Sequence, residues 1–564
     1  MLLILLSWIY ILAISIAIGI TINKLLKIFA TDAVVITFLG FFSITLFAGF
    51  WAIFFAVNWQ FHVVLLVLSA VLLKVNGLAL QSFISNLKKE LKTLSSFLKV
   101  VLVVVTILIL AQCASPPFLI DNESYYIQTI KWLNDYGFVK GLVNLHLFLG
   151  QTSGWHILQS AFSFSFIYES FNDLSGLCLL LGNYYAIVRL NNYITNQGTS
   201  KVNLMIGFFP IFNVFLFQFV SAPSPDVAVY VIGLIVFHLF IKSYSTFSKP
   251  SFLTLCTLSL FLVLIKISAT IFLVFPLVVL VKHFSHIKKI MKLVFVFGSL
   301  TLLLIVIKNL IITGNAIYPL TTVEALSFNW HLPKVVETYF QNYGLAYGYN
   351  MTPEVFKTSS FLELFKSWLL QPNLHGVFNG LLIVLLIVSP WLIVKSKYKK
   401  ALGIIYSVAF LNLLFLFAVS PQYRFFFQFI IILSLFILSM IIKKQKAIKI
   451  VVGLGLVITA IPLFSAMKIP MLSESQTQTT SVFKLNYVIE PHSNSRYQTD
   501  HKTIQLENTT INTPTNINFF WATGNTPIPA LNKQQLEYFK TYFKVVPQQQ
   551  STDIKDGFYF KKVE

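Results

Sequence analysis

Residues 97–123 read FLKVVLVVVTILILAQCASPPFLIDNE: a long apolar run, a Pro-Pro break and an acidic triplet. About 20 apolar residues are enough for a helix to cross the ~30 Å hydrocarbon core of a bilayer. Backbone groups in lipid must be satisfied within the segment, so such a run forms a helix. Similar runs recur along most of the chain, which predicts an all-α polytopic membrane protein.

The composition agrees with this prediction. Of the 564 residues only 11% are charged and 56% are hydrophobic, and the mean hydropathy is +0.77. A soluble domain carries about 25% charged residues, so this chain lacks the side chains to cover a water-facing surface of its size. The net charge of +21 comes mostly from lysines between the apolar runs, where they act as orientation signals, so we expect no nucleic-acid partner.

Lysine and arginine clusters mark the cytoplasmic loops and divide the chain into about 14 spans, with both termini outside. The first run lacks a positively charged start and a clear cleavage site, so we interpret it as a retained span rather than a signal peptide. Residues 154–168 are expected to form an interfacial or re-entrant helix; if they span the membrane instead, Asp226 moves to the cytoplasmic side. The expected spans are Leu2–Ile22, Ala33–Ala56, Phe61–Leu80, Phe97–Ala114, Leu174–Tyr193, Leu204–Val220, Val227–Ile241, Phe252–Ile265, Ala269–Val281, Leu293–Ile312, Gly376–Val394, Leu402–Val419, Phe425–Ile442 and Ile450–Ala466.

This threading divides the chain into three parts. They are N-terminal transmembrane helices at 1–96, a transmembrane core at 97–467 with outer loops at 115–153 and 313–374, and an extracytoplasmic tail at 468–564. The tail is polar, and its pattern predicts a small amphipathic helix at 534–540 and a short strand at 557–562. The three cysteines lie in or beside apolar runs, which favours neither a disulfide framework nor a cysteine metal site.

Two acids, Asp121 and Glu123, follow the 97–114 span at the outer membrane boundary. A carboxylate there is placed to take a proton from an acceptor hydroxyl, and partial burial would raise its pKa toward a useful range. The structural alternative is that Asp121 caps the helix expected at 124–136. Two carboxylate ligands are too few to assign a metal site, so we assign none. Binding of a divalent cation by this pair is an alternative that stays open.

Further polar residues of the first outer loop are candidates for substrate binding. Tyr125 and Gln128 lie one helical turn apart on one face of the expected helix. Asn144 and His146 offer groups that bind sugar hydroxyls or a phosphate. Anchoring at the membrane interface explains the tyrosine equally well, and a lone histidine is more often structural.

Three charged residues near the membrane complete the candidate set. Asp226 is either a helix cap or a second outward acid able to meet Asp121 in one cleft. Lys266 stands between two short apolar helices, where an unpaired charge is costly, so its partner is expected to be a phosphate or Asp226. The structural alternative is a turn lysine that extends its ammonium to the membrane surface. Arg424 breaks the charge bias because its turn faces outward, and its planar fork suits phosphate oxygens.

Together these segments resemble the GT-C superfamily of polytopic membrane glycosyltransferases. The similarity is closest to an uncharacterised bacterial membrane-protein family of that type, and it runs from about residue 97 to the end. Tyr126 stands where that family has a His, and Phe148 stands near an expected Arg. The residues that carry the resemblance are Asp121, Tyr125, Gln128, Lys131, Trp132, Gly141, Leu142, Asn144, Leu145, His146, Ser224, Pro225, Asp226, Lys266, Ser268, Pro421, Arg424 and Phe425.

The resemblance implies a GT-C-like bundle in the bacterial cytoplasmic membrane, with the large loops and the tail outside. It implies a transferase that moves a sugar, with inversion, from a polyprenyl-phosphate donor to a glycan, lipid or protein acceptor at the outer face. Asp121 would be the base, Arg424 and Lys266 would offset the charge of the leaving phosphate, and no cofactor is required. Three alternatives stay open: a lipid-linked glycan polymerase or ligase, a non-enzymatic lipid-linked-sugar transporter, and a structural assembly partner whose tail does the binding.

Overall fold

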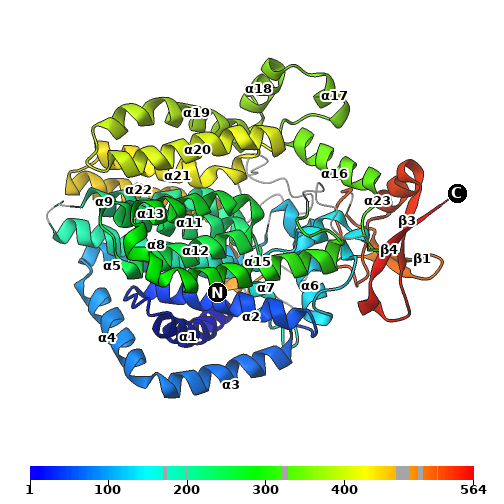
Figure 1. The fold of residues 1–564 in the computed structure, drawn as a ribbon, viewed down its shortest axis with the longest axis horizontal. Coiled ribbons are helices and arrows are strands. Elements are labelled where there is room, and N and C mark those ends of the chain that lie inside the picture. The colour runs from blue at the N-terminus through cyan, green and yellow to red at the C-terminus, as the bar shows by residue number, and fades with distance from the viewer. Residues whose placement is uncertain are drawn as a thin grey trace.

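The computed structural model describes residues 1–564 except 118, 169–173, 197, 199, 320–327, 465–481, 493–498, 518 and 564. Long helices run side by side in one bundle, and the C-terminal strands cover one end of it (Figure 1). Parts of the expected outer loop at 313–374 and of the expected tail at 468–564 therefore lie outside the described residues.

The expected apolar runs form helices, because only a helix satisfies the backbone within one apolar segment. The bundle helices are α1 (Leu2–Leu25), α2 (Ala33–Ala52), α3 (Trp59–Val75), α4 (Gly77–Thr93), α5 (Ser96–Ala114), α8 (Leu174–Thr195), α9 (Lys201–Gly207), α10 (Asn213–Leu216), α11 (Pro225–Ser245), α12 (Lys249–Ile265), α13 (Val274–Lys282), α14 (Phe284–Ile287), α15 (Met291–Thr313), α19 (Asn373–Val394), α20 (Lys399–Val419), α21 (Phe427–Ile441) and α22 (Gln445–Phe464).

Among the described residues, nine helices are long and apolar enough to cross a membrane, or ten if the bent pair α3–α4 counts as one span. They are α1, α2, α5, the segment Lys201–Phe219 that contains α9 and α10, α11, α15, α19, α20 and α22. The other expected spans coincide with α8, which carries several polar residues, and with three shorter apolar helices. The multi-pass architecture is therefore confirmed by length and composition, and the count of fourteen stays a prediction.

The first two helices pack unusually closely. A Cβ added to Gly19 of α1 would lie 2.0 Å from the carbonyl oxygen of Ile36, and one added to Gly40 of α2 would lie 1.9 Å from that of Ser15. Glycine at these positions lets the two backbones touch, which is how helices associate in lipid without a hydrophobic driving force.

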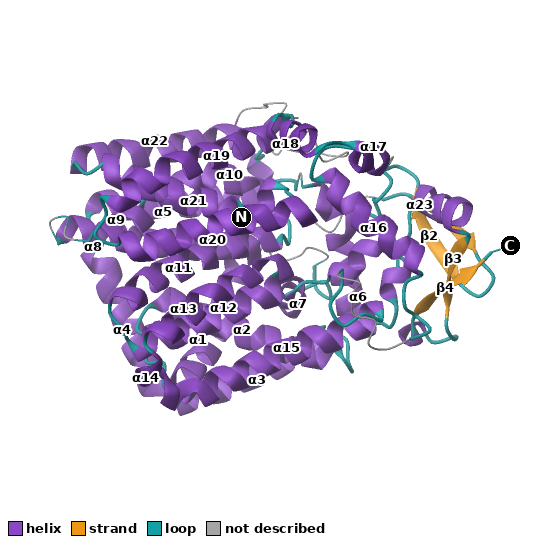
Figure 2. Ribbon diagram, turned by 45° about the horizontal axis from the view of Figure 1, so that its top comes forward, coloured by secondary structure: helices purple, strands orange, loops and turns teal. Residues whose placement is uncertain are grey.

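An outer layer of short elements covers the end of the bundle near the strands (Figure 2). The predicted interfacial segment at 154–168 contains α7, whose eight residues span only about 12 Å, too little to cross a bilayer. The predicted tail helix and strand are confirmed as α23 and β4. The outer elements are α6 (Ile127–Asp135), α7 (Gly154–Ala161), α16 (Lys334–Tyr347), α17 (Pro353–Thr358), α18 (Phe361–Leu369), α23 (Lys533–Tyr538), β1 (His501–Gln505), β2 (Thr510–Pro514), β3 (Val545–Gln549) and β4 (Phe558–Lys562).

The strands form two antiparallel pairs, β1 with β2 and β3 with β4. The start of β4 is tied to the loop at 115–153, because the Phe558 amide donates to the carbonyl of Lys140 over 3.0 Å. Gly557 makes this contact possible: its φ is +97°, and a Cβ there would lie 1.9 Å from the Lys140 oxygen. The tail thus rests directly on the loop that carries the candidate acids.

Candidate functional site

The structure brings Asp121 and Arg424 into direct contact. Asp121 lies just before a π-helical turn (Asn122–Tyr126) that leads into α6, and Arg424 lies in the short turn before α21. Nη1 of Arg424 donates to Oδ2 of Asp121 over 2.6 Å. Oδ1 of Asp121 has no hydrogen bond within the described part of the chain, and the side chain keeps 17% of its exposure, so this oxygen is open to a ligand.

A second ion pair adjoins the first. Asp226 lies in the first turn of α11, a helix capped by the Ser224 hydroxyl. The Asp226 carboxylate binds the ammonium of Lys266, which lies at the break after α12. The other oxygen of Asp226 lies 3.8 Å from Nη1 of Arg424. Asp226 and a phosphate were the two predicted partners of Lys266, and the structure shows Asp226. The expected meeting of Asp121 and Asp226 occurs through Arg424, which contacts both.

Neighbouring polar groups hold this four-residue cluster, which we call the charge cluster, in place. The Tyr126 hydroxyl donates to Oδ2 of Asp121 over 3.3 Å. Gln422 accepts from Nη2 of Arg424 over 3.3 Å, and the Tyr230 hydroxyl donates to the Arg424 carbonyl over 3.0 Å. Each cluster residue comes from a different segment of the chain, so its position depends on the packing of the whole bundle.

The charges of the cluster cancel: two carboxylates face two cations. Burial lowers the pKa of the Arg424 guanidinium, but Asp121 and Asp226 together raise it well above its ordinary value. Burial raises the pKa of Tyr126, and the negative charge of Asp121 adds to that rise. Arg424 therefore stays charged and Tyr126 stays a neutral donor at any physiological pH.

Three predicted ligand residues bind the tail instead. The Gln128 amide donates to the carbonyls of Gly524 and Thr526 over 3.1 and 2.8 Å. Nε2 of His146 lies 2.9 Å from the Trp521 carbonyl, and the Asn144 amide donates to the Phe558 carbonyl over 3.2 Å, among others. These hydrogen bonds explain why the three side chains are buried without invoking a substrate. That they bind a substrate stays a prediction, and their contacts do not support it.

The remaining two candidates lie beside the cluster. Glu123 is buried, and its backbone carbonyl accepts from the amides of Thr523 and Gly524, which fixes the tail against this turn. Tyr125 stacks on Phe148, with ring centroids 5.2 Å apart. Whether either residue also binds a substrate stays a prediction.

Sequence reasoning missed three residues at the site. Tyr230 lies one helical turn after Asp226 on the same face, and that spacing is a signal that could have found it. Gln422 precedes Arg424 by two positions in the same turn, which is a weaker signal. His156 packs on Tyr126 with ring centroids 4.8 Å apart, and it comes from a segment whose placement the sequence left ambiguous.

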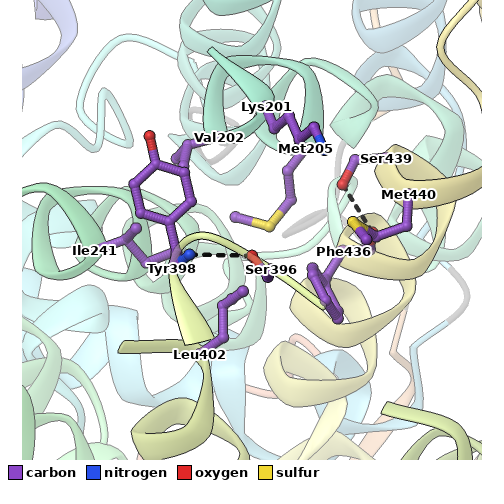
Figure 3. Close-up of a pocket in the computed structure, with 10 residues that line it drawn as sticks. All are labelled: Lys201, Val202, Met205, Ile241, Ser396, Tyr398, Leu402, Phe436, Ser439 and Met440. Atoms are coloured by element: carbon purple, nitrogen blue, oxygen red, sulfur yellow. Dashed lines mark hydrogen bonds between the residues drawn. The ribbon is translucent and has the colours of Figure 1, made fainter. Parts of the chain in front are cut away.

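No group of three or more His, Cys, Asp or Glu side chains is placed to hold a metal ion within the described ranges. Two crevices lie elsewhere. One crevice lies between the start of α9 at Lys201 and the N-cap of α20 at Tyr398 (Figure 3). Its volume is about 20 Å³, enough for one water molecule. The other is an apolar crevice of about 330 Å³ lined by Phe212, Phe215 and Leu454 among others. Neither contains a residue of the charge cluster.

The helices and the charge cluster define a multi-pass membrane protein with a charged site at the end of its bundle. The chain belongs to the family described as a domain of unknown function (DUF8201), whose sequence model matches residues 1–431. No curated protein and no solved structure matches the chain. The matched range contains all four residues of the charge cluster and stops before α22 and the tail.

Proposed function

We propose that this protein is a membrane glycosyltransferase of the GT-C type, which moves a sugar from a polyprenyl-phosphate donor to an acceptor hydroxyl at the outer face of the bacterial cytoplasmic membrane. The observation that carries the proposal is the charge cluster, in which the accessible carboxylate of Asp121 contacts Arg424, and Arg424 and Lys266 both contact Asp226. Transfer of a sugar from a phosphate carrier needs a base for the acceptor hydroxyl and cations for the leaving phosphate, all within one small volume.

In this proposal Asp121 is the base. Its free Oδ1 takes the proton of the acceptor hydroxyl, the acceptor oxygen attacks the anomeric carbon, and the bond from that carbon to the phosphate oxygen breaks with inversion. The polyprenyl phosphate leaves with the bonding electrons. Tyr126 and Arg424 keep the carboxylate in its orientation, because both donate to its other oxygen.

Arg424 and Lys266 are proposed to bind the phosphate. Both cations contact the Asp226 carboxylate, so they lie close enough to bind different oxygens of one phosphate. Asp226 is 1% exposed, which suits a residue that holds the cations rather than one that meets a substrate. Before the donor binds, the two acids neutralise these partly buried cations, which lowers the cost of taking the charges out of water.

A lipid-linked-sugar transporter is the second candidate, because a second group of polar residues includes a residue farther along α11, the helix that carries Asp226. In α8, Arg189 pairs with Asp32, and Tyr185 is hydrogen bonded to His238 of α11 over 2.5 Å. His238 follows Asp226 by about 18 Å along α11. Polar groups at two depths along one helix are what a path across the membrane would use.

The decisive experiment reconstitutes the purified chain into liposomes with a panel of polyprenyl-phosphate sugars and measures release of the lipid phosphate. Release by the wild type that is lost in Asp121→Ala, with unchanged membrane insertion, supports the transferase. The same liposomes report movement of a labelled donor between leaflets. Donor movement without any phosphate release would instead support the transporter, and release that survives Asp121→Ala would remove Asp121 as the base.

A further inference from the structure

Helix α4 does not continue the path of α3. The two helices meet at a bend of 88° around Asn76, so α4 lies across the bundle if α3 runs along it. Both views place α4 at the end of the bundle opposite the strands (Figures 1 and 2). A helix perpendicular to a span, at the end of that span, lies in the plane of the membrane surface.

Three faces of α4 have different surroundings. Phe83 is buried and packs with Ile20 and Ile36 of the first two helices, which fixes one face to the bundle. Ile84 and Leu91 lie two turns apart on a second face and are 40% and 37% exposed. On the other side of the bend, α3 also exposes apolar side chains, among them Val63, Val67 and Val71.

The third face is basic. Lys88, Lys89 and Lys92 are all exposed, and none of them forms an ion pair within the part of the chain that the structure describes. By helical spacing Lys88 stands between Ile84 and Leu91 along the edge of the apolar face. A lysine there has its stem beside apolar surface and its ammonium at the boundary with water. Further exposed lysines surround α4: Lys24, Lys27, Lys74 and Lys99.

The acids near these lysines already have partners. The Glu90 carboxylate of α4 accepts the hydroxyl of Tyr184 over 2.8 Å, and Asp32 pairs with Arg189. The positive charge of these lysines is therefore available to bind an anionic partner outside the chain.

We propose that α4 is an interfacial helix that binds anionic phospholipids of the adjoining leaflet, which the lysine distribution assigns to the cytoplasmic side. Ile84 and Leu91 insert among the acyl chains, and Lys88, Lys89 and Lys92 bind the headgroup phosphates. An amphipathic helix with a basic face gains affinity from both sources, and each lysine near such a surface adds to the attraction.

The first test measures depth in the full chain. The native cysteines are buried, so a fluorophore on Ile84→Cys or on Ser85→Cys reports its own position in vesicles. We expect the Ile84→Cys label to be shielded from aqueous iodide and quenched by a lipid-borne quencher, and the Ser85→Cys label to show the reverse. Equal access of iodide to both labels would overturn the proposal.

The second test measures lipid selectivity. Native mass spectrometry compares phosphatidylglycerol with phosphatidylcholine retained by the detergent-purified protein. The triple variant Lys88→Gln/Lys89→Gln/Lys92→Gln should lose roughly tenfold or more of the preference for the anionic lipid. The control Lys397→Gln/Lys399→Gln/Lys400→Gln removes the same charge from exposed positions at the start of α20 and just before it and should lose much less. Equal losses, no loss, or tight binding of an added acidic protein or nucleic acid without lipid preference would contradict the assignment.

Discussion

Arg424 and Asp121 form a hydrogen-bonded ion pair of 2.6 Å although 303 positions separate them in the chain. The same guanidinium lies 3.8 Å from Asp226, so one side chain joins three segments of the bundle. Arginine suits this position because its planar fork donates in several directions at once, whereas a lysine offers a single point charge. The predictions below start from this pair.

Arg424→Lys should lower the rate of lipid-phosphate release by roughly 10–100-fold, and Arg424→Gln by about 10³-fold, because a positioned donor at developing charge is worth that much. Lys keeps the charge but loses the fork. The release assay in liposomes measures both variants. Lys366→Gln, which removes an exposed cation from α18, is the matched control and should keep wild-type release. Full activity of Arg424→Gln would remove this residue from the proposed site.

Lys266→Met should destabilise the protein by about 3 kcal/mol, because it leaves the buried Asp226 carboxylate without its nearest cation. The double variant Asp226→Asn/Lys266→Met should recover most of that loss, since neither charge then remains uncompensated. Denaturation in mixed micelles, arranged as a double-mutant cycle, measures the coupling. Additive effects of the two substitutions would show that the pair does not interact in the membrane.

Gln128→Ala should loosen the tail, because it removes the donor of the buried Gly524 carbonyl and leaves the Thr526 carbonyl with Lys131 as its donor, at a cost of about 1–3 kcal/mol. Hydrogen exchange at residues 521–526 should accelerate while the bundle helices stay protected. Gln505→Ala removes an exposed glutamine from β1 and serves as the control. Unchanged exchange in Gln128→Ala would mean that other contacts alone dock the tail.

Tail docking should also weaken at low pH. Burial lowers the pKa of His146 from 6.5 to about 4, although its bond to Trp521 acts in the opposite direction. The unfolded state therefore binds more protons between pH 6.5 and 4, so stability is full above 6.5 and falls as the pH drops through this window. Hydrogen exchange near Trp521 should speed up accordingly. In His146→Gln, which keeps a donor but does not titrate, this part of the pH dependence should disappear.

Gly40→Ala should separate α1 from α2, since the new Cβ would lie 1.9 Å from the backbone oxygen of Ser15. We expect a loss of several kcal/mol or failure to fold, because backbone cannot move aside as a flexible side chain can. Gly380→Ala in α19 is the control: nothing lies within 4 Å of its Cβ, and higher helix propensity should stabilise it by up to about 1 kcal/mol. Equal melting temperatures of the two variants would contradict the close packing.

Much of the local structure could be predicted from the sequence. Each predicted span overlaps a helix, because an apolar segment must satisfy its backbone internally whatever its neighbours are. The cost of an unpaired charge in an apolar setting likewise indicated that Lys266 has a partner. The bend between α3 and α4 was not predicted: the expected span at 61–80 ran across Asn76 and Gly77, although Asn-Gly is a turn signal.

The amino-acid pattern by itself determined that the chain forms apolar helices and that Asp121, Asp226, Lys266 and Arg424 stand at their ends. Only the tertiary structure decided which of these charges meet. It also decided that Gln128 and His146 bind the backbone of a tail almost 400 positions away. The physical reason is that helix formation depends on neighbours in sequence, whereas hydrogen bonds and ion pairs between segments depend on how complete helices pack.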